Sequence, residues 1–387
     1  MGYAGTRPWC DVPDSRYRRN RNTGSIVGKR PEMRLWIGKN TWVSRRALRQ
    51  AASLELDQIR SVAVIKHGAL GDMVLTRPML RTLRDALPQA RLTLSVVSHY
   101  QAGIPEELVD HVHVAQGNDR KASPGEIFRS FRSLGTHDIL FDITASSRSF
   151  WITRLNRARM KIGYRHRGLE RLLYDVAIPR AEYRFEAETF LEQAHILGFN
   201  YDWPLRYGQT VAPLSRQKPY IVYFPTASAD YKCWPGERYA QLIDSMSRRW
   251  PAYEHILLAG LAPWEQERCR TIAAQLSPRD NVIHQQGDND TPRLLAGASL
   301  VIANDTGIRN LSIALERPTV GVFFYAQYRG LPNCGAQPFG YFPRNQEHAI
   351  AFRPDGGVPE VAEVESYAER ILNYLQQRPL SAPHHPT

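Results

Sequence analysis

The segment 61–81 limits the possible folds of this chain more than any other stretch. Val62–Ile65 is a short apolar, β-branched run bounded by polar residues, which predicts a buried strand that leads into a helix. Gly68 and Gly71 lie in the turn between strand and helix, where glycine permits a tight turn and a close backbone approach to a ligand. Asp72 stands where the helix begins, so its carboxylate either caps the helix or faces a cleft above the strand ends. The segment therefore predicts an α/β fold with a ligand-facing turn.

Short apolar runs and amphipathic stretches alternate along the rest of the chain. We expect strands at 91–97, 139–143, 220–224, 255–259, 300–303 and 319–324, and helices at 78–87, 125–133, 149–155, 188–198, 237–249, 264–276 and 306–315. Strands that alternate with helices form a parallel, doubly wound sheet. Because the chain is too long for one ordinary domain, we expect two Rossmann-like domains of the α/β class.

The composition also suggests where these domains begin and end. A stretch with two prolines and one glycine at 201–218 separates two alternating regions. We expect a basic, partly disordered leader at 1–58, a first domain at 59–205, a linker at 206–218, a second domain at 219–378 and a disordered tail at 379–387. A cleft between two such domains is a favoured place for a ligand.

Positive charge is concentrated at the start of the chain. The first 60 residues hold 13 Lys or Arg and 5 Asp or Glu, so they carry eight of the twelve net positive charges. Residues 1–32 show no apolar period and are expected to be disordered. Residues 33–56 place Trp and Leu beside Arg, and either lie on an anionic membrane surface or pack as a helix on the first domain.

Cysteine usage and hydropathy indicate the compartment. Cys10, Cys233, Cys269 and Cys334 are far apart and form no Cys-x-x-Cys pair, which predicts neither a zinc site nor a disulfide framework and fits a reducing cytoplasm. No apolar run approaches the length of about 18 residues that a spanning helix needs, and the N-terminus lacks the apolar segment of a signal peptide. We therefore expect a soluble or peripheral cytoplasmic protein.

Two further loops follow predicted strands and carry residues suited to phosphate. In 225–235, Thr226, Ser228 and Lys232 combine hydroxyl donors with one ammonium group. At 305–307, the sequence Asp-Thr-Gly precedes a helix whose first amides and dipole stabilise negative charge, although its Asp305 is equally well placed as a plain N-cap.

Three other features allow a functional and a plainer interpretation. Glu265 lies at a helix start after a strand, where an acidic residue also simply complements the helix dipole. Residues 147–174 carry eight Lys or Arg and one Glu, which is typical of a solvated helix face but also of a surface that binds phosphate- or carboxylate-bearing sugars. The Asp-Asn-Asp run at 288–290 has no further oxygen ligands nearby, so it predicts a polar surface loop and no metal site.

Three of these motifs, in this order, resemble those of glycosyltransferase family 9, the ADP-heptose:lipopolysaccharide heptosyltransferases. The first is Gly71-Asp72 followed by Thr-x-Pro, in the string VIKHGALGDMVLTRPMLR. The second is Ser228, followed four residues later by Lys232 and then by x-Trp-Pro. The third is Asn-Asp-Thr-Gly at 304–307, followed by a helix and by Pro318 before the next strand. The resemblance implies the GT-B architecture, with the acceptor on the first Rossmann-like domain and a nucleotide-sugar on the second, facing each other across a cleft.

The resemblance also implies an activity and a role for each candidate residue. It implies an inverting displacement that moves heptose from ADP-heptose to a lipopolysaccharide core or related glycan acceptor without a cofactor or metal, with Asp72 as the general base and Lys232 neutralising the departing diphosphate. The implied donor-binding residues are Thr226, Ser228, Lys232, Glu265, Asp305, Thr306, Gly307 and Asn310. The implied acceptor-binding residues are Arg148, Arg154 and Arg157, and the implied turn residues are Gly68 and Gly71. The implied partners are the nucleotide-sugar and a lipid-linked glycan, with peripheral contact to the inner face of the plasma membrane through the basic leader.

One position departs from the family pattern. Asn310 stands where the family has a histidine, and an asparagine can hydrogen-bond but carries no proton at neutral pH. The identity of the donor is therefore open. The alternatives are a transferase of another nucleotide-sugar in capsule or O-antigen synthesis and a catalytically inactive GT-B binding protein in which Asp72 is only a helix cap. A nucleic-acid binder is disfavoured, because the body of the chain is only mildly basic and does not interleave aromatic with basic residues.

Overall fold

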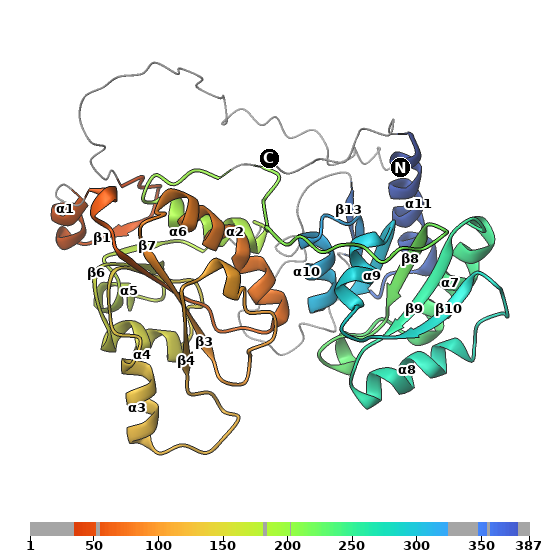
Figure 1. Cartoon of the computed structure of the whole chain (residues 1–387), viewed down its shortest axis with the longest axis horizontal. Coiled ribbons are helices and arrows are strands. Elements are labelled where there is room, and N and C mark those ends of the chain that lie inside the picture. Colours follow the sequence, from red (N-terminus) through yellow and green to blue (C-terminus); the bar gives the residue numbers. More distant parts are fainter. Residues whose placement is uncertain are drawn as a thin grey trace, which may run out of the picture. The chain divides into compact units, whose positions relative to one another are not determined.

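The computed structural model describes residues 35–51, 55–180, 184–201, 203–323, 347–353 and 357–377. Within these ranges the chain forms two sheets, each built from one continuous part of the sequence and flanked by helices (Figure 1). The predicted α/β class with two doubly wound sheets is therefore confirmed. Among the described helices, none is long and apolar enough to span a bilayer.

The first sheet has the strand order of a Rossmann fold. Its order is β1-β7-β6-β5-β2-β3-β4, and all neighbours pair in parallel except β1, which runs antiparallel to β7. The strands are β1 (Trp42–Val43), β2 (Ser61–Ile65), β3 (Arg91–Val97), β4 (His111–Ala115), β5 (Thr136–Asp142), β6 (Arg157–Tyr164) and β7 (Val176–Ile178). The strand order reverses direction between β2 and β5, and ligands of such sheets bind at the carboxyl ends of the strands beside this point.

Helices cover both faces of the first sheet. They are α1 (Arg45–Ala51), α2 (Leu70–Ala86), α3 (Pro124–Arg132), α4 (Ser147–Leu155), α5 (Glu170–Leu173) and α6 (Glu186–His195), with 3-10 turns η1 (Leu56–Gln58) and η2 (Glu106–Leu108). Helices α2 and α6 pack against each other, and their apolar side chains bury Val62 and Val64 of β2. Side chains of α3 and α4 bury Ala63 and Ile65, which alternate to the opposite face. Strand β2 is thus buried on both sides, as its unbroken apolar run predicts.

The second sheet repeats this topology. Its order is β10-β9-β8-β11-β12-β13, all parallel, so the reversal falls between β8 and β11. The strands are β8 (Tyr220–Phe224), β9 (Glu254–Ala259), β10 (Val282–Gln286), β11 (Leu300–Asn304), β12 (Thr319–Val322) and β13 (His348–Ala351). The helices are α7 (Gly236–Arg249), α8 (Pro263–Ala273), α9 (Thr291–Gly297), α10 (Gly307–Ala314) and α11 (Val361–Gln377), with a 3-10 turn η3 (Asp230–Lys232).

The two sheets are joined through helices α2 and α10 and through the connecting segment. The N-terminal turns of α2 and α10 meet so closely that a Cβ added at Gly71 would lie 2.5 Å from Nδ2 of Asn310. In the connecting segment, the backbone oxygen of Tyr207 accepts a hydrogen bond of 2.9 Å from Nε of buried Arg77 in α2. Further along, Arg216 forms an ion pair of 2.6 Å with Glu254 of β9. The segment predicted as a linker is therefore bonded to elements of both sheets.

The structure differs from the expected domain boundary at residue 58. Strand β1 and helix α1 precede this boundary, yet β1 pairs with β7 and the alanines Ala47 and Ala51 of α1 are buried in the first core. For α1, the structure supports the alternative of a helix packed on the first domain. Residues 1–34 and 378–387, with most of the predicted leader and the tail, lie outside the described residues, as do Cys10 and Cys334. Cys233 and Cys269 are buried and unpaired.

Two local expectations need correction. Helix α2 begins at Leu70, close to Asp72 where a helix start was expected, so the helix expected at 78–87 is only its later part and Pro78 lies inside it. Burial of the apolar residues from Met73 to Leu75 favours the longer helix, despite the backbone hydrogen bond that proline cannot donate. The arginine-rich run at 147–174 is not one helix face, because β6 occupies its centre and exposes only alternate residues such as Arg157 and Arg159.

Candidate functional site

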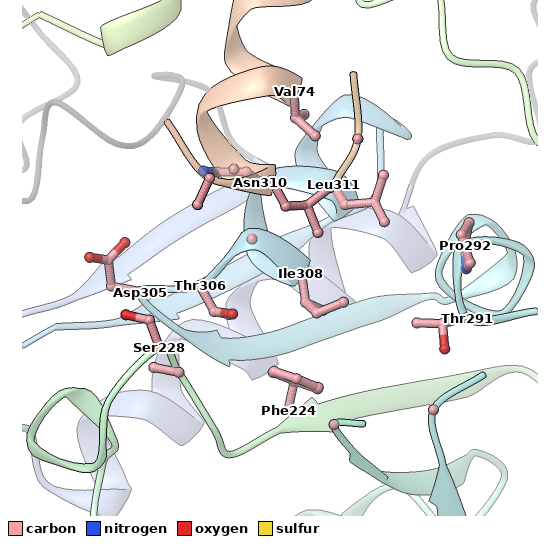
Figure 2. Close-up of a pocket in the computed structure, with 18 of the residues that line it drawn as sticks. Val74, Phe224, Ser228, Thr291, Pro292, Asp305, Thr306, Ile308, Asn310 and Leu311 are labelled. Carbon is pink, nitrogen blue, oxygen red and sulfur yellow. The ribbon is translucent and has the colours of Figure 1, made fainter. Parts of the chain in front are cut away.

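A cavity of about 780 Å³ lies where carboxyl ends of strands from both sheets meet. Its walls come from the turn after β2, the loops after β8, β9 and β10, and the start of α10. Figure 2 shows Asn310 and Leu311 of α10 beside the helix that carries Val74, with Ser228 near Asp305 and Thr306 on one side of the cavity. The cavity therefore occupies the place that the topology of both sheets predicts for a ligand.

Asp72 lines this cavity from the first turn of α2. Its Oδ2 accepts a hydrogen bond of 3.1 Å from the backbone N–H of Ala69, which caps the helix. Its Oδ1 lies 2.8 Å from Nζ of Lys66, which comes from the end of β2. The carboxylate is 35% exposed, so it is fixed by two partners and still open to the cavity. The two interpretations of Asp72 as cap and as ligand-facing group are therefore compatible.

Lys66 is buried beneath Asp72. Its side chain is only 5% exposed, and its ammonium also lies 3.7 Å from Glu186 and 4.4 Å from the ring centre of Phe190. Burial acts to lower the pKa of Lys66, but the carboxylates of Asp72 and Glu186 outweigh this effect and raise the pKa above its usual value. Lys66 thus stays charged at neutral pH and holds the Asp72 carboxylate in place.

The two glycines of the turn are required by close contacts. A Cβ at Gly68 would collide with the side chain of Asp72. A Cβ at Gly71 would reach the amide of Asn310 and lie 3.4 Å from Cα of Gly307, so Gly71 lets the starts of α2 and α10 approach. Gly71 lines the cavity, whereas Gly68 makes room for the carboxylate behind it.

The loop after β8 and the start of α8 form another wall. Ser228 and Lys232, which ends η3, both line the cavity. Thr226 is fully buried and does not line it, but its hydroxyl donates a hydrogen bond of 2.8 Å to Oε1 of Glu265. The other oxygen of Glu265 accepts a hydrogen bond of 3.0 Å from the N–H of Ala262. Thr226 therefore acts on the cavity through Glu265, whose carboxylate it orients.

Helix α10 presents its N-terminus to the cavity. Thr306 is the N-cap residue, and no side chain caps this helix end. Thr306 and Gly307 line the cavity, so the start of α10 and its helix dipole can face an anion. Asp305 is not the N-cap; it accepts a hydrogen bond of 3.0 Å from Nη2 of fully buried Arg309. Arg309 therefore partly neutralises Asp305 beside this helix N-terminus.

Asn310 is the fourth residue of α10 and lies at the contact with Gly71. The side chain is 7% exposed, lines the cavity, and has an Oδ1 without a hydrogen-bond partner among the described residues. An unpartnered buried amide oxygen can accept a hydrogen bond from a ligand N–H or O–H group.

The structure separates the predicted site residues into two groups. Those that line the cavity are Gly71, Asp72, Ser228, Lys232, Glu265, Asp305, Thr306, Gly307 and Asn310. The three arginines of the predicted acceptor site do not line it: Arg148 donates a hydrogen bond of 3.0 Å to Asn118, Arg154 lies in the last turn of α4 and Arg157 begins β6. Because β6 is parallel to β5, Arg157 lies at the amino end of the sheet, away from the cavity.

Sequence reasoning gave no role to Lys66, Glu186 and Asp288. Lys66 could have been noticed as a charged residue that directly continues a buried apolar strand. Glu186 offers no local signal, because only the packing of α6 on α2 brings it to Lys66. Asp288 is exposed in a loop, as predicted, and also lines the cavity. No group of three or more His, Cys, Asp or Glu suited to a metal ion occurs among the described residues.

Curated proteins with detectable similarity are heptosyltransferases. Lipopolysaccharide heptosyltransferase 1 of Escherichia coli strain K12 is 26% identical over 284 residues, which cover 68% of this chain and 87% of that protein. Lipopolysaccharide heptosyltransferase 3 of the same strain is 23% identical over 278 residues, covering 65% and 79% of the two chains.

Solved structures with the same fold carry related names. A glycosyl transferase of family 9 from Veillonella parvula superposes with a TM-score of 0.62 at 19% identity, covering 83% of this chain and 99% of that one. The Escherichia coli heptosyltransferase WaaC with ADP-2-deoxy-2-fluoro heptose gives a TM-score of 0.60 at 22% identity, covering 82% and 99%. These similarities show a shared fold, and they confirm the predicted GT-B architecture.

The family model described as glycosyltransferase family 9 (heptosyltransferase) matches residues 127–337, which is more than half of the chain. This range includes the loops after β8 and β9 and the start of α10, which form most of the cavity wall on the second sheet. With the motifs, the fold and the cavity in agreement, the chain belongs to glycosyltransferase family 9.

Proposed function

We propose that this glycosyltransferase moves heptose from ADP-heptose to a saccharide of the lipopolysaccharide core, by a single displacement that inverts the anomeric centre. The observation that carries the proposal is that the Asp72 carboxylate and the uncapped N-terminus of α10 line one cavity. A base on one wall and an anion-binding helix end on another suit an acceptor and a nucleotide-sugar placed between them. The names of the similar curated proteins support heptose as the sugar and lipopolysaccharide as the acceptor.

In the proposed reaction, an acceptor hydroxyl attacks the anomeric carbon while the bond to the diphosphate oxygen breaks. The hydroxyl proton passes to a carboxylate oxygen of Asp72, and the diphosphate leaves with the bonding electron pair. Lys66, 2.8 Å from Asp72, holds the carboxylate in the orientation in which it would accept this proton. Asp72 is also the cavity carboxylate that projects from the first sheet's ligand-binding turn, where the family resemblance puts the acceptor.

The leaving diphosphate would be bound by the second sheet. Ser228 and Lys232 supply a hydroxyl and an ammonium group, and the first amides of α10 at Thr306 and Gly307 supply fixed dipoles. Glu265, oriented by Thr226, is placed to accept hydrogen bonds from the ribose hydroxyls. These groups can stabilise the charge that a divalent cation offsets in other transferases.

The acceptor in this proposal is a lipid-linked glycan at the inner face of the plasma membrane. The arginines first predicted to bind it lie outside the cavity, so they would contact only parts of the acceptor that extend beyond the reacting sugar. The enzyme then works at a membrane surface without crossing it, and its donor reaches the cavity from the cytoplasm.

The test is the substitution Asp72→Asn, assayed for heptose transfer and for ADP binding by calorimetry. Loss of a general base should lower turnover by roughly 10²- to 10⁴-fold, while the nucleotide affinity stays within about threefold. Asp85→Asn, at an exposed position on the same helix, is the matched control and should leave both quantities unchanged. Turnover above a tenth of the wild-type rate in Asp72→Asn would refute the assignment. Lys232→Ala should weaken both nucleotide binding and turnover.

A second candidate donor is favoured by Asn310. Its buried, unpartnered Oδ1 offers a hydrogen-bond acceptor where the family resemblance predicts a histidine, so a nucleotide-sugar other than ADP-heptose could be preferred. Calorimetry with ADP, UDP, GDP and their sugar conjugates separates the two cases. Selective binding of ADP-heptose supports the first proposal, selective binding of a UDP- or GDP-sugar supports the second, and binding of none supports an inactive scaffold.

A further inference from the structure

Large apolar side chains are exposed beside arginines on helices α4 and α5. Trp151 of α4 is 60% exposed and Leu172 of α5 is 65% exposed, and Leu169 just before α5 is also exposed. Arg167 and Arg171 are exposed in the same stretch. We call these five residues the α4–α5 patch. Single exposed apolar residues are ordinary, but three that share a surface with arginines need a reason.

Side-chain contacts show that α4 and α5 share one surface. The two helices are in contact, and the ring of Phe150 in α4 lies 5.2 Å from the ring of His166 in the loop before α5. Phe150 also packs against a buried cluster that contains Leu173, the last residue of α5, and Tyr174, which follows it. Their sequence neighbours Trp151 and Leu172 therefore point outward from adjoining helices.

The patch carries unopposed positive charge. Glu170, the one acidic residue between 147 and 174, is only 5% exposed, and its carboxylate is occupied by the backbone N–H groups of His166 and Gly168 and by Arg165. No acidic side chain is therefore exposed anywhere in this segment. Arg167 has no ion-pair partner among the described residues, and Arg171 lies over the ring of Trp42 with its charge still exposed.

The position of the patch in the fold relates it to the cavity. The loop 165–169 follows the carboxyl end of β6, and α4 begins after the carboxyl end of β5. Because β5, β6 and β2 are parallel, these segments start at the same edge of the sheet as the turn that carries Asp72. A flat surface that touches the patch would thus lie beside the edge where the cavity is found.

We propose that the α4–α5 patch is a docking surface for an anionic lipid bilayer. Indole and leucine side chains insert at the level of the headgroups, and arginines bind phosphate there. The charge complementarity is with lipid phosphate, since the patch offers no acidic or amide group to recognise a particular protein sequence. The proposal stands on this surface alone, so it holds whether or not the reaction proposed above is correct.

The test uses the full chain and vesicles of phosphatidylcholine alone or in equimolar mixture with phosphatidylglycerol, with binding measured by cosedimentation. The wild-type chain should bind the mixed vesicles and not the neutral ones. Trp151→Ser/Leu172→Ser should lower the partition coefficient at least about tenfold, and Arg167→Glu/Arg171→Glu at least about 25-fold. The basic leader is present in every variant, so its own attraction cancels in these comparisons.

Matched controls distinguish this surface from charge in general. Phe128→Ser on α3, which is 46% exposed, and Arg132→Glu/Arg248→Glu remove similar groups elsewhere and should leave binding within about twofold of wild type. Unchanged calorimetric ADP binding and unfolding midpoints verify that the patch variants are folded. The proposal is overturned if the wild type ignores anionic vesicles, if the patch variants bind like wild type, or if the controls lose as much. It is also overturned if the patch variants only convert a dimer to a monomer, since the patch would then join two copies of the chain.

Discussion

Replacing Lys66 with methionine tests whether the buried ammonium holds the candidate base in place. Removing one partner of a buried ion pair costs about 3–5 kcal/mol, because the remaining charges lose their compensation. Here the Asp72 carboxylate is 35% exposed, and Glu186 keeps a second partner in Arg180 at 2.9 Å. We therefore expect a cost at the lower end of this energy range. Methionine fills nearly the same space, so the packing loss is small. We expect Lys66→Met to lower the free energy of unfolding by about 3 kcal/mol.

The assay is urea unfolding of Lys66→Met, Glu186→Gln and the double variant at pH 7. The double variant no longer contains the uncompensated Glu186 carboxylate. Its loss of unfolding free energy should therefore be smaller, by about 1 kcal/mol or more, than the sum of the losses in the two single variants. Lys218→Met, at an exposed position, should change stability by less than about 0.5 kcal/mol. In the proposed reaction, heptose transfer should fall at least about tenfold in Lys66→Met, because a carboxylate without its fixed partner spends less time in the reactive orientation.

The pH dependence of the stability difference between wild type and Lys66→Met distinguishes loss of the ion pair from loss of packing. Since the pKa of Lys66 is raised in the folded chain, the ion pair contributes fully below the ordinary lysine value of about 10.5 and is lost as the pH rises through the folded pKa. The stability difference between wild type and Lys66→Met should therefore be constant from neutral pH to about pH 10 and shrink above it. A loss below about 1 kcal/mol at pH 7, or one that does not change at high pH, refutes the reasoning.

Two further predictions concern hydrogen bonding and buried histidines. Thr226→Val removes the hydroxyl that holds Glu265, a net contribution of about 1 kcal/mol, so ADP affinity measured by calorimetry should fall roughly fivefold; equal affinity would show that Thr226 does not act through Glu265. Burial lowers the pKa of His67 to about 3 and those of His255 and His348 to about 4. Below about pH 6.5 the unfolded chain binds protons that the folded chain excludes, so unfolding free energy should fall by about 1 kcal/mol per histidine between pH 7.5 and 5.5. His67→Gln should make this decline shallower, and an identical slope would contradict the assignment.

The strands and turns that hold the site could be predicted because their signals are local. The apolar runs at 62–65 and 300–303 are bounded by turn residues, so both the strands and the helix starts after them are visible in sequence. Strand β6 was missed because its exposed arginines alternate within a basic run, which masks the buried positions between them. Its neighbours in the sheet, not its own composition, make this segment a strand.

Contacts between distant segments could not be predicted in the same way. Asp72 was identified from its turn, but its pairing with Lys66 and the approach of Glu186 depend on the packing of α6 on α2. The arginine prediction treated charge as a sign of ligand binding, whereas Arg154 and Arg157 lie at the end of a helix and the start of a strand. The density of charged residues in a sequence does not show which way their side chains point, and this orientation decides which side chains reach the cavity.

The division of the two sheets along the chain has a consequence for synthesis. Every described strand of the first sheet precedes residue 179, and every described strand of the second follows residue 219. The first sheet can therefore fold while the remainder is still being translated, as domains generally do. The contact of α2 with α10, and with it the cavity, forms only after residue 314 has left the ribosome. A chain interrupted before this point can fold its first half, and with it Asp72 and Lys66, but has no helix end against which to place a donor.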